Sequence, residues 1–124
     1  MIEVSGELAR VSSPSLVPCD SPIDIDHLSR MTLGERSLER EVLELFDRQA
    51  GMLLSRMQAD ALPIAAASAH TLKGSARSIG AWRVATAAEN VENATAARFT
   101  AALAALDAAV GEARTAIAGL LRAH

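Results

Sequence analysis

The chain has 124 residues, half of them apolar but only three aromatic, and its formal net charge is −3. This length fits one domain, and the charge gives no indication of nucleic-acid binding. Alanine is the most frequent of the apolar residues, which favours closely packed helices over a β-sandwich or barrel. The single cysteine, Cys19, excludes an internal disulfide and a cysteine-based metal site.

The first 22 residues are rich in serine and proline and show no lasting periodicity. They predict a flexible leader over residues 1–22, followed by one domain over residues 23–124. No apolar run approaches the roughly 18 residues of a membrane span, and the start lacks the basic region of a signal peptide. We therefore expect a cytoplasmic protein without a membrane partner, and the alanine- and arginine-rich composition hints at a bacterial source.

Helical signals dominate from residue 23 onward. A short first helix is predicted from Ile23 to Arg30. The sequence from Thr32 to Glu35 fits a capping box, which would open a helix that ends near Met57. The apolar residues of that helix are expected largely on one stripe: Leu38, Val42, Leu45, Phe46, Met52, Leu53 and Met57.

Three further helices follow. Asp60 is the expected N-cap of a helix that includes Pro63 in its first turn, continues to about Ser78 and stops at Gly80. The next two helices are predicted at about residues 81–94 and 97–121. The last has a clear apolar stripe: Phe99, Leu103, Leu106, Val110, Ala113, Ile117 and Leu120. Four long helices with short connections predict an all-α fold, an antiparallel four-helix bundle with a short additional N-terminal helix.

The helix before Gly80 separates into two faces. Its buried face is predicted to hold Leu62, Ala65, Ala69, Leu72, Ala76 and Ile79. A different, partly solvated face carries His70, Lys73, Gly74 and Arg77 at i, i+3, i+4 and i+7. An imidazole, an ammonium group, bare backbone and a guanidinium group therefore form one row along the helix.

These residue types suit phosphoryl chemistry. A neutral histidine has a free ring nitrogen that can attack phosphorus, and a lysine one turn away can stabilise the added negative charge. Lys73 is the only lysine among twelve basic residues. Glycine within a helix costs about 1 kcal/mol relative to alanine, so Gly74 suggests that another molecule approaches the backbone beside His70.

The residues alone leave a second interpretation open. His70, Lys73 and Arg77 are equally consistent with an ordinary solvated surface, and Gly74 with close helix packing. His27 and His124 lack comparable neighbours and are interpreted as surface positions. The sequence contains no metal-ligand cluster, P-loop or nucleotide-binding glycine motif.

The segment His70-Thr71-Leu72-Lys73-Gly74-Ser75, with Ile79-Gly80-Ala81 and the later Val91-Glu92, resembles the signature of histidine-containing phosphotransfer (HPt) domains. The resemblance covers about residues 23–122. It implies a four-helix bundle in which His70 accepts the phosphoryl group, Lys73 stabilises the phosphate and Gly74 gives steric access.

The same resemblance makes Glu92 the candidate for orienting the histidine ring. A glutamate there would hold the Nδ1 proton and leave Nε2 to react, although a solvated acid on a helix face is an equally good interpretation. Arg77, Ser75 and Thr71 become candidates for docking a partner.

The resemblance further implies a phosphocarrier rather than a self-sufficient enzyme. His70 would accept a phosphoryl group from the aspartate of one response-regulator receiver domain and pass it to the aspartate of another, in a relay that includes a (hybrid) histidine kinase. The chain itself would need no cofactor, because Mg²⁺ belongs to the partner receiver. Two alternatives remain: a phosphoacceptor module of a larger chemotaxis-type or hybrid kinase, and a structural bundle without phosphotransfer.

Overall fold

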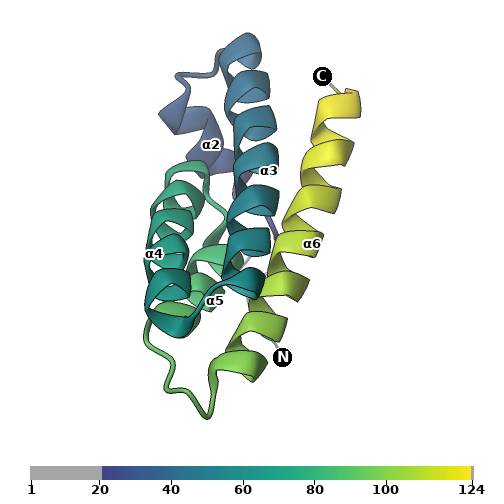
Figure 1. The fold of residues 1–124 in the computed structure, drawn as a ribbon. Coiled ribbons are helices and arrows are strands. Elements are labelled where there is room, and N and C mark those ends of the chain that lie inside the picture. The colour runs from purple at the N-terminus through teal and green to yellow at the C-terminus, as the bar shows by residue number, and fades with distance from the viewer. Residues whose placement is uncertain (1–20, 124) are drawn as a thin grey trace, which may run out of the picture.

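The computed structural model describes residues 21–123, and these residues form five helices and no strand (Figure 1). The predicted leader falls largely on residues 1–20, which lie outside the described residues, as does His124. The helices are α2 (Ile25–Met31), α3 (Arg36–Ala59), α4 (Leu62–Ile79), α5 (Trp82–Glu92) and α6 (Phe99–Ala123).

The four longer helices form an antiparallel bundle, as predicted. Contacts join α3 to α4, α4 to α5, α5 to α6 and α6 back to α3, so the helices enclose one core. In Figure 1, α3 and α6 extend past α4 and α5 toward the top of the view, and the short α2 lies beside this extension. The all-α bundle with an additional N-terminal helix is therefore confirmed.

The core combines a few large side chains with many alanines. The largest fully buried side chains include Leu43, Met57, Leu72, Leu106 and Ile117. Small residues fill the space between them, and the buried alanines of α4 and α5 are Ala65, Ala69, Ala76, Ala85, Ala87 and Ala88. Small side chains allow two helix axes to approach closely, which sets how near side chains of α5 can come to α4.

The start of α3 differs from the sequence expectation. Thr32 does not open α3 but closes α2, and its hydroxyl donates to the Leu28 carbonyl at 2.9 Å. The N-cap of α3 is Glu35, without a side-chain capping bond. The predicted capping box is wrong because the Thr32 hydroxyl bonds back to the preceding turn, a local option open to threonine.

The start of α4 differs in a similar way. Asp60 is the C-cap of α3, and the N-cap of α4 is Ala61, which makes no side-chain capping bond. The predicted role of Asp60 is therefore wrong. Pro63 does lie in the first turn of α4, where proline leaves no hydrogen bond unmade.

The apolar stripe predicted for α3 is only partly correct. Phe46, Leu53 and Met57 are buried as expected, together with Leu43, Ala50 and Leu54. In contrast, Leu38, Leu45 and Met52 are exposed. These three residues lie roughly 130° around the helix from the buried set, at about 100° per residue. Helix α3 therefore has a second, uncovered apolar stripe.

The turn between α4 and α5 anchors the N-terminal helix. Gly80 ends α4 in a left-handed conformation with φ +81°, as its C-terminal position predicted. Its carbonyl accepts a hydrogen bond from the Asp24 amide at 2.9 Å. The Asp24 carboxylate in turn accepts from the Trp82 indole at 2.9 Å and from the His27 amide at 3.1 Å. Residues at the start of α2 are thus tied to the end of α4 and the start of α5.

His27 takes part in this packing. Its ring lies edge-on to that of Trp82, with centroids 4.9 Å apart, and its Nε2 atom is buried without a hydrogen-bond partner. The expectation that His27 is a surface position is therefore wrong. The sequence offered no sign of this contact, because the two residues are far apart along the chain.

Candidate functional site

The two predicted faces of α4 are present in the structure. Ala65, Ala69, Leu72, Ala76 and Ile79 are buried. The His70 side chain is 67% exposed and that of Lys73 only 14%, since the lysine leans toward α5. The helix thus presents the imidazole to solvent while its buried face fixes the helix in the bundle.

Glu92, the last residue of α5, joins His70 and Lys73. Its Oε2 atom lies 2.6 Å from His70 Nδ1, and its Oε1 atom accepts a hydrogen bond from Lys73 Nζ at 2.7 Å. The structure therefore brings together three of the residues singled out from the sequence. Both oxygens of one carboxylate are used, one for each basic group.

These contacts act on the Glu92 carboxylate. The hydrogen bond from Lys73, followed by the one from His70, lowers the pKa of Glu92 below its ordinary value of 4.5. Both bonds favour the ionised form. Glu92 is therefore a carboxylate at neutral pH and can only accept hydrogen bonds.

That charge state determines the histidine tautomer. Because the carboxylate accepts from Nδ1, this nitrogen must carry a proton, and the lone pair of a neutral ring lies on Nε2. Within the described residues no group is hydrogen-bonded to Nε2. The ring thus has one nitrogen held by the protein and one available to a partner.

Gly74 leaves open space one turn beyond His70. Apart from the adjoining backbone of α4 itself, a Cβ atom added there would meet no atom within 4 Å. Close packing against another helix therefore does not account for this glycine. The absence of a side chain keeps the surface beside His70 flat.

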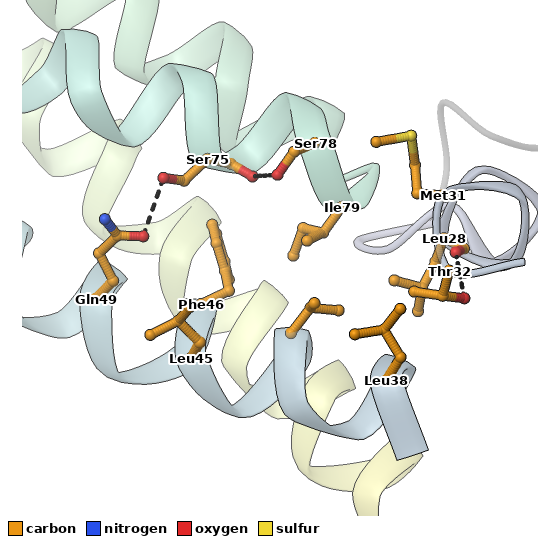
Figure 2. A pocket seen from close by; sticks show the side chains of 11 residues that line it. Leu28, Met31, Thr32, Leu38, Leu45, Phe46, Gln49, Ser75, Ser78 and Ile79 are labelled. Carbon is orange, nitrogen blue, oxygen red and sulfur yellow. Dashed lines mark hydrogen bonds between the residues drawn. The ribbon is translucent and has the colours of Figure 1, made fainter. Parts of the chain in front are cut away.

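The three docking candidates lie on different sides of this surface. Arg77 Nη2 is 4.0 Å from Glu89 Oε1 on α5, and the guanidinium side chain is 55% exposed. Thr71 is exposed and its hydroxyl donates to the Ala67 carbonyl of the same helix. Ser75 points toward α3, where its hydroxyl donates to Gln49 Oε1 at 2.9 Å (Figure 2).

Two partners of these residues were not anticipated. Gln49 of α3 bonds Ser75, and Glu89 of α5 faces Arg77. Glu89 lies one turn before Glu92, so the spacing could have indicated it once α5 had been placed beside α4. No comparable local signal indicates Gln49.

Neither a metal centre nor a membrane span is found in the described part of the chain. No group of three or more metal-ligating side chains occurs among residues 21–123. None of the helices there is both long and apolar enough to cross a bilayer.

Comparisons with known proteins now bear on this arrangement. Neither the curated proteins nor the solved structures include a significant match. A family model described as the Hpt domain matches residues 40–122, which run from the first half of α3 almost to the end of α6 and include His70, Lys73, Gly74 and Glu92. This match covers well over half of the chain and coincides with the four-helix bundle. The chain therefore belongs to the Hpt domain family.

Proposed function

We propose that His70 is the phosphoacceptor of this Hpt domain and that it exchanges phosphoryl groups with aspartates of receiver domains. Histidine phosphotransfer in phosphorelay signalling is the general role of the family. The observation that carries the specific proposal is the exposed imidazole with Nδ1 held by Glu92 and Nε2 free.

The chemistry follows from this tautomer. The Nε2 lone pair attacks the phosphorus of an aspartyl phosphate, an N–P bond forms, and the P–O bond to the aspartate breaks with the electron pair leaving on the carboxylate. The ring then carries positive charge, because Nδ1 keeps its proton. The Glu92 carboxylate, 2.6 Å from Nδ1, stabilises that charge. Transfer onward to a second aspartate is the reverse of the same step.

Lys73 supplies the charge for the phosphoryl oxygens. Lys73 lies one helical turn from His70 on α4, and its ammonium group is bound to the same Glu92 carboxylate as the imidazole. The ammonium group therefore lies on the same side of α4 as the imidazole. We propose that the ammonium turns from Glu92 toward the new phosphoryl group, whose oxygens are strong acceptors. Mg²⁺, which neutralises charge in phosphoryl transfer, is proposed to reside on the partner receiver.

The test of His70 is a labelling experiment. His70→Gln should abolish acid-labile, base-stable phosphorylation while leaving helicity and thermal unfolding unchanged, because the side chain is exposed. His27→Gln and His124→Gln serve as matched controls and should retain the label. Normal labelling of His70→Gln would disprove the assignment.

The partner is tested by transfer from a panel of phosphorylated receiver domains of the source genome. We expect at least one receiver to label His70 and to recover the label in the reverse reaction. A parallel reaction with ATP and the ATP-binding domains of histidine kinases tests the alternative of a kinase module. Labelling by a kinase domain together with no exchange with any receiver would favour that alternative.

A further inference from the structure

Helix α3 carries an apolar stripe that no other helix among residues 21–123 covers. Its members are Leu38, Leu45 and Met52, and the side chains of the last two are 57% and 56% exposed. Figure 2 shows Leu38 and Leu45 on α3 beside a groove between α2, α3 and α4 that is lined mainly by apolar side chains. Near the Leu38 end of the stripe, Met31 and Leu33 are exposed as well. Contiguous exposed apolar side chains of this kind mark a surface for another protein.

The stripe has the spacing of a helix-pairing seam, and we call Leu38, Leu45 and Met52 the α3 seam. They recur every seven residues, so they stay close to one line along the helix. Side chains at this spacing pack against a second helix that runs nearly parallel or antiparallel to the first. The seam is symmetric about Leu45, because Leu38 and Met52 lie at equal distances on either side of it. It can therefore pack against an identical copy of itself in the antiparallel direction.

Two opposite charges flank the α3 seam with nearly the same symmetry. Glu41 lies four residues before Leu45 and Arg48 three residues after it, and both residues are exposed. At about 100° per residue, the two side chains point within about 20° of each other, on one side of the seam. Neither forms an ion pair within residues 21–123. Both charges are therefore available to a partner that lies along the seam.

An antiparallel pairing of two α3 helices about Leu45 brings these charges together. The two-fold axis passes between the two Leu45 side chains, perpendicular to both helices, so flanking side chains stay on the same side of the contact. Glu41 of each copy is then within one residue, or about 1.5 Å of helix, of the level of Arg48 of the other copy. In a parallel pairing each charge is level with its own counterpart, and no such ion pair forms. The charges thus select an identical, antiparallel partner.

A second set of charges, farther from the centre, fits the same pairing. Glu35 lies ten residues before Leu45 and Arg56 eleven residues after it, and both are exposed. In the antiparallel arrangement these residues of opposite copies are again within one residue of the same level. Met52 of one copy would meet the exposed apolar side chains at the α2 end of the other. The apolar and the charged residues therefore agree on one register.

We propose that this protein forms a homodimer in which the α3 helices of two copies pack antiparallel along the α3 seam, with Glu41 of each copy paired to Arg48 of the other. The apolar seam supplies the affinity, and the ion pairs, which are exposed at the edge of the contact, supply direction and register. The inference does not rest on the proposed function, because the seam belongs to α3 whereas the His70 site is built by α4 and α5.

Sedimentation velocity of the full chain at increasing concentration tests the dimer. Wild type should become dimeric, and Leu45→Glu should raise the Kd of the dimer about tenfold or more, the loss expected for a central contact. Ala108→Glu is the matched control, because it adds the same charge at an exposed position of α6, and its Kd should be unchanged. Since Leu45 is exposed, both variants should keep wild-type helicity in circular dichroism. A wild-type chain that stays monomeric at millimolar concentration would overturn the proposal.

Charge reversal tests the register. Glu41→Arg and Arg48→Glu should each weaken self-association, because like charges then face each other across the contact. A mixture of the two single variants should form a heterodimer, since one copy carries two acids where the other carries two bases, and the double variant should restore the homodimer. Asp107→Arg and Arg98→Glu make the same reversals at exposed positions off the seam and should leave the Kd unchanged. A wild-type dimer that survives all reversals, or that the mixture and the double variant fail to restore, would overturn the antiparallel α3 contact.

Discussion

At the scale of single residues, Glu92 has two basic partners that hold its carboxylate in the ionised form. The larger effect on the pKa of Glu92 comes from Lys73 and the smaller from His70. We therefore expect Lys73→Met to raise the pKa of Glu92 toward 4.5 more than His70→Ala does. An NMR titration of the Glu92 carboxyl carbon in the two variants measures both pKa changes. Equal midpoints in wild type and Lys73→Met would contradict the Lys73–Glu92 ion pair.

The same depressed pKa predicts how stability depends on pH. A carboxyl group whose pKa is lower in the folded state stabilises the fold above its unfolded pKa, and this contribution is lost as the pH falls through the folded value. Wild type should therefore lose more stability below about pH 4.5 than Glu92→Gln does. Urea unfolding of both proteins at about pH 7 and about pH 3 measures the difference. Parallel losses in the two proteins would exclude a stabilising role for the ionised group.

Substitutions of Gly74 distinguish its role in giving a partner access to His70 from its effect on the stability of α4. Nothing lies within 4 Å of its added Cβ, so Gly74→Ala should stabilise α4 by up to about 1 kcal/mol. Gly111 of α6 has equally open surroundings and provides the matched control. Gly74→Leu should slow transfer from a receiver but much less from phosphoramidate, while Gly111→Leu should change neither rate. Normal receiver transfer by Gly74→Leu would show that the glycine does not provide access.

The site residues were the part of the molecule most open to prediction from sequence. His70, Lys73 and Gly74 lie within one short motif, and helical periodicity places them on one face. Glu92 required the family resemblance, because its position depends on how α5 returns beside α4. Gln49 could not be identified, since its contact with Ser75 depends on the register between α3 and α4.

At the scale of whole elements, the existence of each helix was predictable but its ends were less so. Thr32 and Asp60 are good N-cap residues by type, yet both close the preceding helix. A short polar side chain can bond a carbonyl behind it or an amide ahead of it, and tertiary packing decides which. The apolar stripe predicted for α3 is partly wrong because residue type does not tell which of two adjoining apolar faces packs against the core. Leu38, Leu45 and Met52 lie on the face that remains exposed.

The attachment of α2 is testable through Trp82. Trp82→Phe keeps the aromatic ring but removes the indole donor that lowers the pKa of Asp24. We expect the pKa of Asp24 to rise and the free energy of unfolding to fall by about 1 kcal/mol, the value of one hydrogen bond. Hydrogen exchange of α2 amides should accelerate before that of α3. Uniform acceleration across the bundle would mean that α2 does not open separately.

The glycine that ends α4 gives an independent test of the contact between the start of α2 and the turn between α4 and α5. Gly80 has φ +81°, and a Cβ there would lie 2.9 Å from Asp24 Cβ and 3.0 Å from the Asp24 carbonyl oxygen. Gly80→Ala should therefore destabilise the protein by more than about 1 kcal/mol, opposite in sign to Gly74→Ala. Thermal unfolding of the two alanine variants compares them directly. Stabilisation by Gly80→Ala would contradict the close approach of α2.

At the scale of the whole molecule, the bundle was predictable because four amphipathic helices with short connections have few ways to bury their apolar faces. The separation between α4 and α5 was not predictable, although the site depends on it. Buried alanines on both helices permit the close approach that brings Glu92 of α5 to His70 and Lys73 of α4. The alanine-rich composition therefore has a functional consequence as well as a structural one.

Core packing between α4 and α5 should therefore control the geometry of the site. Ala69 is buried next to His70, on the side of α4 that also directs Lys73 toward α5. Ala69→Leu should overfill that space and destabilise the protein by about 1–3 kcal/mol. If the bundle accommodates the leucine by moving α5 outward, the hydrogen bonds to Glu92 lengthen and the pKa of Glu92 rises toward 4.5.

Ala104→Leu makes the same substitution at an exposed position of α6 and should change neither quantity. Urea unfolding and the NMR titration of Glu92 measure both effects in each variant. Destabilisation of Ala69→Leu with an unchanged pKa of Glu92 would mean that the strain is absorbed elsewhere in the core. The geometry of the phosphotransfer site would then be independent of the distance between α4 and α5, contrary to the dependence inferred from the buried alanines.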